Sequence, residues 1–145
     1  MKWQVKALII CGILIFASGV GLYSLMLAFT ESLYVERGSY AYYLLIPSFI
    51  KNVPQPQIVG EPEYYSSCGD GPKPMATGVS FYSKDLKSEL FDQINRYAVA
   101  AGYTPDPDAV ITGDYGYRRG SMAFEFKIEA ESNGTNSVAA YEIGF

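Results

Sequence analysis

An uncharged stretch near the N-terminus limits most strongly what this chain can fold into. The 23 residues from Ala7 to Phe29 contain no charged side chain. As an α-helix rising about 1.5 Å per residue, this stretch would be roughly 35 Å long, enough to cross a hydrocarbon core of about 30 Å. The sequence therefore predicts one transmembrane helix over residues 7–29, with the lipid bilayer as its partner.

A cleaved signal peptide is the alternative interpretation of this stretch. Signal peptides have an apolar region of about 7–15 residues, followed by a cleavage site with small residues. The apolar run here is longer and ends in Leu-Ala-Phe-Thr. An uncleaved anchor is therefore favoured over a signal peptide.

The charges that flank the apolar run indicate its orientation. Lys2 and Lys6 precede the run, whereas two glutamates and one arginine follow it closely. The positive-inside rule then places residues 1–6 in the cytoplasm and everything after Thr30 outside it. Because the layout is compact, a bacterial source is favoured, and we expect the inner membrane with a periplasmic C-terminal domain.

Small residues recur along one face of the expected transmembrane helix. Their spacing of i, i+4, i+7 and i+11 lets a second helix approach closely, although membrane helices are rich in small residues in any case. The predicted helix–helix contact consists of Ala17, Gly21, Ser24 and Ala28.

Two segments of unusual composition separate the apolar run from the rest of the chain. Residues 30–50 are rich in tyrosine, and such side chains favour the headgroup zone of a membrane. This juxtamembrane segment is expected to lie on the bilayer, to pack on the folded domain or to dock a partner. Its candidate contact residues are Tyr34, Tyr40, Tyr42 and Tyr43.

Residues 51–76 contain five prolines and three glycines and show neither helical nor strand periodicity. Because proline-rich segments are extended and semi-rigid, this composition predicts a tether that holds the folded part away from the bilayer.

Residues 77–145 show the periodicities of a small folded domain. Alternating apolar residues predict a strand near residues 77–82, and apolar residues at helical spacing predict a helix that ends at Gly102. A second strand is expected to begin at residues 109–112. Strict alternation from Met122 predicts a third strand.

A fourth strand is expected after the hairpin signal Asn133-Gly134. The polar side of the preceding strand, with Glu125 and Glu129, is expected to face water. The predicted fold is thus α+β, with one helix on an antiparallel sheet of about four strands in the order β-α-β-β-β. The residues expected to face the core from the last strand are Ala139, Tyr141, Ile143 and Phe145.

The composition excludes several classes of chemistry. The chain has no histidine, which removes Ser-His-Asp and Cys-His nucleophile systems and most zinc and haem sites. Cys11 lies in the apolar run and Cys68 outside it, so Cys68 is expected to be a free thiol or an intermolecular bridge. We therefore expect no catalytic, cofactor or metal site. The net charge of −4 argues against binding nucleic acid.

The stretch GDYGYRRG, residues 113–120, offers the strongest candidate for a partner-binding site. Its glycines favour a turn that leads into the strand from Met122, which would leave aromatic and arginine side chains exposed at the rim of the sheet. Such side chains are frequent in protein–protein hot spots. The candidates are Tyr115, Tyr117, Arg118 and Arg119.

One anchor followed by a small α+β domain resembles small membrane-anchored immunity proteins, which neutralise toxins that act in the periplasm. This resemblance is one of layout and involves no motif. It implies a non-enzymatic binding protein or inhibitor that acts on a toxin or enzyme. The alternative is a small accessory or assembly subunit of an inner-membrane complex, bound through the anchor and the juxtamembrane tyrosines.

The orientation can be tested with a reporter enzyme that is active only outside the cytoplasm, fused after Phe145. We expect this fusion to be active and a matched fusion to a cytoplasmic reporter to be silent, because the two lysines before the apolar run retain the N-terminus inside. The opposite pattern would overturn the predicted placement.

Overall fold

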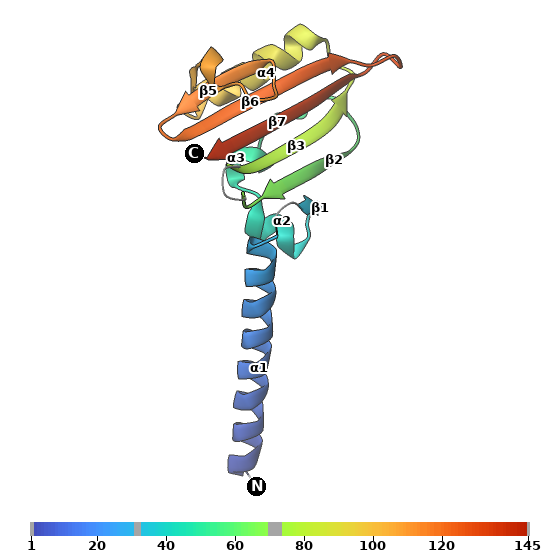
Figure 1. The fold of residues 1–145 in the computed structure, drawn as a ribbon. Coiled ribbons are helices and arrows are strands. Elements are labelled where there is room, and N and C mark those ends of the chain that lie inside the picture. The colour runs from blue at the N-terminus through green and yellow to red at the C-terminus, as the bar shows by residue number, and fades with distance from the viewer. Residues whose placement is uncertain (1, 31–32, 70–73, 145) are drawn as a thin grey trace. The chain divides into compact units, whose positions relative to one another are not determined.

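The computed structural model describes residues 2–30, 33–69 and 74–144. It divides the chain into two compact units, Met1–Thr30 and Glu31–Phe145 (Figure 1). Each unit is described by itself below.

The first unit is the helix α1 (Lys2–Ala28). Its segment Leu8–Leu27 has a mean hydropathy of 2.2 and is long and apolar enough to cross a membrane, although a signal sequence would satisfy the same criterion. The hydroxyls of Ser18 and Ser24 each donate to the carbonyl four residues earlier, at 2.8 Å. These polar groups are thus satisfied within the helix, as a hydrocarbon environment requires.

The second unit is built on an antiparallel sheet. In the part of the chain that the structure describes, seven strands follow the order β1-β2-β3-β7-β6-β5-β4 (Figure 1). The chain leaves β3 through a helix and returns so that β7 pairs with both β3 and β6. The strands are β1 (Leu33–Val35), β2 (Ile58–Ser67), β3 (Met75–Ser83), β4 (Thr104–Pro105), β5 (Tyr115–Arg119), β6 (Met122–Ala130) and β7 (Asn136–Gly144).

Three α-helices cover one face of this sheet, which we call the helix face. They are α2 (Tyr40–Leu45), α3 (Ser48–Lys51) and α4 (Lys87–Ala100). In α4, Leu90, Ile94 and Ala98 recur at helical spacing and are fully buried, which confirms the predicted helix. Gly102, with φ of +86°, follows the end of this helix in the conformation that favours glycine.

Aromatic packing connects α3 to the sheet and to α4. The ring of Phe49 stacks on Tyr97 and Tyr103 and meets the edge of Phe124, each with centroids 5.0 Å apart. The Tyr97 hydroxyl also donates to the Phe49 carbonyl. Helix α3 therefore packs into the core of the folded unit.

The prediction of a tether over residues 51–76 and a folded domain over residues 77–145 is wrong, and so is the number of about four strands. Residues 58–67 form β2, the hairpin partner of β3. The prolines hid this strand because they lie around it or at its bulge: Pro56 precedes β2, and Pro62 lies in the irregular stretch between Val59 and Glu63. The folded unit begins at Glu31.

Two expectations about the second half of the unit are also wrong. Residues 109–112 do not begin a strand; Pro107–Ala109 form the 3-10 helix η1 and an irregular loop follows. On β7, Ala140 and not Ala139 faces the core, because the register pairs Ala140 with the buried Phe126. Tyr141 and Ile143 consequently lie on the opposite face, and Phe145 lies outside the described residues.

The membership of residues 31–57 in the core can be tested with Ile50→Ala. Ile50 is fully buried, so removing most of its side chain should lower the free energy of unfolding by about 2–5 kcal/mol. Leu44→Ala, at a side chain that is 45% exposed, is the matched control and should cost less than about 1 kcal/mol. Denaturant unfolding of the full chain in maltoside micelles, followed by tyrosine circular dichroism, measures both; equal stabilities would contradict the packing of the segment around Ile50 in the core.

Candidate functional site

The face of the sheet opposite the helices, which we call the open face, is defined by strand register. Residues paired across neighbouring strands share a face, and the pairs form continuous rows across the sheet. One row crosses the sheet from β1 to β5 and carries three tyrosines, one glutamate and two glycines. Its members are Tyr34, Tyr65, Gly78, Tyr141, Glu125 and Gly116.

A loop covers the β5–β6 end of the open face. We call residues 106–114 the covering loop; its Ala109 packs against Ala123 of β6 and Ile143 of β7. Gly116 permits this close approach, because a Cβ there would lie only 2.6 Å from the Asp106 carbonyl oxygen. The covering loop therefore buries the β5–β6 end of the open face, and among the described residues the accessible part lies over β1, β2, β3 and β7.

Glu125, on β6, anchors the covering loop through hydrogen bonds. Its carboxylate is buried and accepts hydrogen bonds from the Thr112 hydroxyl at 2.7 Å, the Thr112 amide at 3.1 Å and the Ile111 amide. Burial alone would raise the pKa of Glu125, but these hydrogen bonds lower it below its ordinary value. The expectation that Glu125 faces water is thus wrong, because the loop returns over the polar side of β6.

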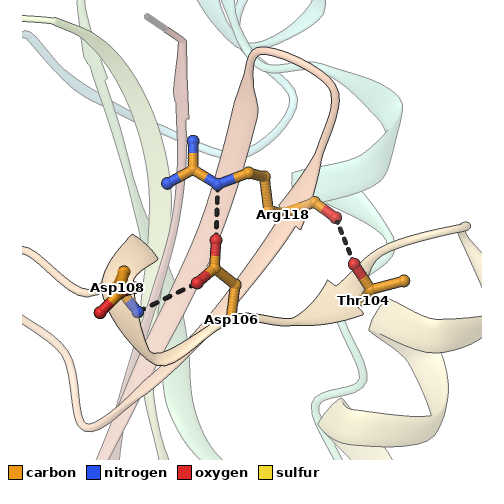
Figure 2. A network of polar contacts seen from close by, with 4 residues as sticks. All are labelled: Thr104, Asp106, Asp108 and Arg118. Atoms are coloured by element: carbon orange, nitrogen blue, oxygen red, sulfur yellow. Dashed lines mark hydrogen bonds and ion pairs between the residues drawn. The ribbon is translucent and has the colours of Figure 1, made fainter.

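Asp106 and Arg118 hold the start of the covering loop, as Figure 2 shows. The Arg118 guanidinium donates to the Asp106 carboxylate at 2.6 Å, and this hydrogen bond lowers the pKa of Asp106. The other carboxylate oxygen accepts from the Asp108 amide at 3.0 Å. The Thr104 hydroxyl donates to the Arg118 carbonyl at 3.2 Å. Arg118 is therefore engaged within the domain.

The structure separates the four residues predicted to bind a partner at the rim. GDYGYRRG contains the strand β5, and the predicted turn into the strand from Met122 is confined to its end, at Gly120 with φ of +60°. Successive strand residues face opposite sides of a sheet. Arg118 lies on the open face, whereas Tyr115, Tyr117 and Arg119 lie on the helix face. Tyr117 is buried, and its hydroxyl donates to Asn95 at 2.8 Å. The expectation of one exposed cluster is wrong.

Arg119 belongs to a cluster that sequence patterns did not reveal. Its guanidinium lies 4.5 Å from the centre of the Tyr103 ring, 3.7 Å from the Glu142 carboxylate and 2.8 Å from the Ala101 carbonyl. The Tyr103 hydroxyl donates to the buried Glu142. Burial and the neighbouring carboxylate raise the pKa of Tyr103, so it stays protonated and serves as a donor at the helix face.

A hollow of about 400 Å³ lies on the open face, away from the covering loop. Gly78 makes room for the ring of Tyr141, because a Cβ there would lie only 2.2 Å from that ring. The Tyr65 ring meets Tyr34 edge to face at 5.8 Å and Tyr141 at 6.5 Å. The hollow is lined by Tyr34, Glu63, Tyr65, Gly78, Val79, Ser80 and Tyr141.

The juxtamembrane tyrosines occupy different environments. Tyr34 belongs to the hollow and is 78% exposed, and Tyr40 and Tyr43 are exposed on α2. Tyr42 is buried, with its ring 4.9 Å from that of Tyr64. Tyr42 therefore packs on the folded domain, whereas contact of the three exposed tyrosines with the bilayer or a partner stays a prediction.

The predicted helix–helix stripe on α1 stays a prediction. Ala17 and Gly21 are exposed, and Ser24 is half-buried. The side chain of Ala28 lies outside the described residues.

Within the described ranges, no group of three histidine, cysteine, aspartate or glutamate side chains is placed to hold a metal ion. Cys11 and Cys68 form no disulfide with each other. Comparison of the chain with protein-family models, with curated proteins and with solved structures finds no match. The function is therefore argued from the open face itself.

The role of Glu125 predicts a pH-dependent stability. Because the folded pKa is below the unfolded value of about 4.3, the carboxylate stabilises the fold above that pH, and this contribution is lost as the pH falls through the folded pKa. Glu125→Gln should therefore lower the free energy of unfolding at pH 7 by about 1–3 kcal/mol. In denaturant titrations, the difference from the wild type should shrink below about pH 4.

Glu129→Gln is the matched control on the same strand and face, at a side chain that is 57% exposed. It should change the stability little at either pH. If Glu125→Gln and Glu129→Gln have the same effect, the covering loop does not depend on the buried carboxylate.

Proposed function

We propose that this chain is a non-enzymatic, single-pass membrane-anchored binding protein, such as an immunity or inhibitor protein that acts on a periplasmic toxin or enzyme. Residues 7–29 anchor it in the bacterial inner membrane, with the N-terminus in the cytoplasm and the folded unit in the periplasm. The folded unit binds its protein partner on the uncovered half of the open face. The observation that carries the proposal is the tyrosine-lined hollow on the open face of the sheet.

The composition of this surface supports protein binding. Tyrosines supply large, amphipathic contact areas at low conformational cost and are enriched in protein–protein hot spots. Three of them are brought together by register from β1, β2 and β7, and one of these, Tyr34, is 78% exposed. An aromatic group held on a rigid sheet is a pre-organised contact surface.

The sheet edges favour face-to-face binding over strand addition. The C-terminal strand β7 is central, so it cannot accept a partner strand as an edge would. The edge strands are β1, with three residues, and β4, with two residues that end in Pro105. Beside β1, Pro62 interrupts the exposed stretch of β2 and lacks an amide donor.

The polar groups that could have suggested catalysis have structural partners. Glu125 fastens the covering loop, Glu142 accepts from Tyr103, and Asp106 pairs with Arg118. The chain also has no histidine to serve as a general base near neutral pH. These features support a binding function over an enzymatic one.

One observation supports the alternative function, an accessory subunit of a membrane complex. Ala17 and Gly21 are exposed on α1 and have the spacing of a close helix–helix contact. The juxtamembrane half of that alternative is weaker, since Tyr42 and Ile46 are buried in the folded unit. The two proposals differ in which unit holds the partner.

Site-specific photocrosslinking in intact membranes tests the proposed function. A photoreactive residue replaces Glu61, which is exposed beside the hollow, or Glu131, which is exposed in the β6–β7 turn. We expect one defined crosslinked protein from position 61 and none from position 131. Exchange of residues 1–30 for an unrelated transmembrane helix should preserve this product.

Loss of the product on exchanging the anchor, with the folded unit intact, would instead favour the accessory subunit. Absence of any position-specific product would contradict binding on the open face.

A further inference from the structure

We propose that the hollow on the open face is a site for a cationic side chain, a lysine or arginine presented by the protein partner. This inference rests on the proposed function and names the chemistry that the binding surface recognises. Four side chains carry it: Tyr34, Tyr65, Tyr141 and Glu63.

The arrangement of the rings suits a cation. An ammonium or guanidinium group is attracted to an aromatic face when it lies within about 6 Å of the ring centre. Tyr65 stands edge to face between Tyr34 and Tyr141, at 5.8 Å and 6.5 Å, so the three rings present differently directed surfaces to one hollow. Gly78 and Ser80 add no bulk, which leaves about 400 Å³ for a long side chain.

The same folded unit already holds cations on tyrosine rings elsewhere. The Lys51 ammonium lies 4.9 Å from the centre of the Tyr42 ring and 5.4 Å from that of Tyr43. The Arg119 guanidinium lies 4.5 Å from the centre of the Tyr103 ring. These internal pairs show the geometry that a partner's side chain would adopt in the hollow.

The hollow carries a negative charge, which attracts a cation. Among the described residues that line it, Glu63 is the one with a charge, and its side chain is exposed. Lys127 lies in the same cross-strand row as Glu63, Ser80 and Ala139, but it is engaged by Glu129 at 2.6 Å. The Glu63 carboxylate is therefore available to a cation from outside.

The surroundings extend this negative charge beyond the hollow. An adjoining open depression of about 840 Å³ shares Tyr34 and Glu63 and adds Glu36 and Glu61 against a single Arg37. Residues 31–145 as a whole carry nine basic and fifteen acidic side chains, a net charge of −6. Such a field favours a partner with a basic surface and accelerates its approach at low ionic strength.

The volume of this depression favours a protein over a free small cation. The hollow seats one side chain, and the adjoining depression accommodates the polypeptide on either side of it. A small cation or a lipid headgroup would use the hollow alone.

The site can be tested by adding small-molecule probes to the full chain in maltoside micelles. NMR signals of isotope-labelled tyrosine rings report the binding. The probes are N-acetyl-arginine amide, N-acetyl-lysine amide, phosphocholine and the uncharged N-acetyl-norleucine amide. We expect the arginine and lysine probes to shift the ring signals of Tyr34, Tyr65 and Tyr141 saturably, with a Kd on the order of 1 mM. The norleucine probe should give no saturable shift.

Matched variants assign the binding to these residues. Glu63→Gln should raise the Kd of the arginine probe at least about threefold. Tyr65→Leu should raise it by a similar factor, because it removes the central ring. The controls, Glu131→Gln and Tyr82→Leu, remove an exposed carboxylate and an exposed tyrosine that do not line the hollow, and they should leave the Kd unchanged. Circular dichroism of each variant verifies that the domain is folded.

In the titrations, three results would overturn the inference: an equal response to norleucine, an unchanged Kd in folded Glu63→Gln, or tighter binding of phosphocholine than of the arginine probe. The photocrosslinked partner separates this inference from the proposed function. A partner still captured by Glu63→Gln and Tyr65→Leu would leave the proposed function standing and overturn the cation site. Binding of the cationic probes without any captured partner would support the site and contradict the proposed function.

Discussion

The folded unit depends on the pairing of β7 with β3 and β6. This last strand returns from the far end of the chain to the centre of the sheet and joins the β1–β2–β3 half to the β4–β5–β6 half. Its register sets both faces at once. Ala140 faces the core between Val79 and Phe126, and its neighbour Tyr141 lies on the open face between Gly78 and Glu125. A slip of one residue would exchange these faces.

The two halves of the open face acquire opposite properties from this register. On one side of Tyr141, the Glu125 carboxylate fastens the covering loop, and Arg118 with Asp106 holds the start of that loop. On the other side, Gly78 lets the Tyr141 ring lie across β3, and no loop from the described residues fills the hollow. The row of paired residues from Tyr34 to Gly116 is thus buried and hydrogen-bonded at Glu125. It is accessible and aromatic at Tyr34 and Tyr65.

Local patterns predicted some elements well. The helical spacing of Leu90, Ile94 and Ala98 and the alternation from Met122 correspond to α4 and β6, because each pattern reports the face that a single element buries. The Asn133-Gly134 signal was also correct, since Gly134 adopts φ of +81° between β6 and β7. By contrast, β2 was missed because its strand residues lie between prolines that dominate the local composition.

The candidate site was harder to predict than the fold. Alternation along β7 is apolar on both sides, so no local rule distinguishes Ala140 from Tyr141 as the core residue. The tyrosines of the hollow come from three strands that are far apart in the sequence, and composition alone left three alternatives open for Tyr34. The adjacent Arg118 and Arg119 formed a plausible cluster only while their segment was taken for a turn.

By itself, the sequence determined the features that depend on neighbouring residues: the long apolar helix, the amphipathic helix α4 and the strands with clear alternation. The tertiary structure decided which side of β7 faces the core, that Glu125 is buried, that the two arginines separate and that three tyrosines meet over Gly78. The physical reason is that these outcomes depend on cross-strand partners and a covering loop. Residues distant in the chain supply them, and periodicity within one segment carries no information about them.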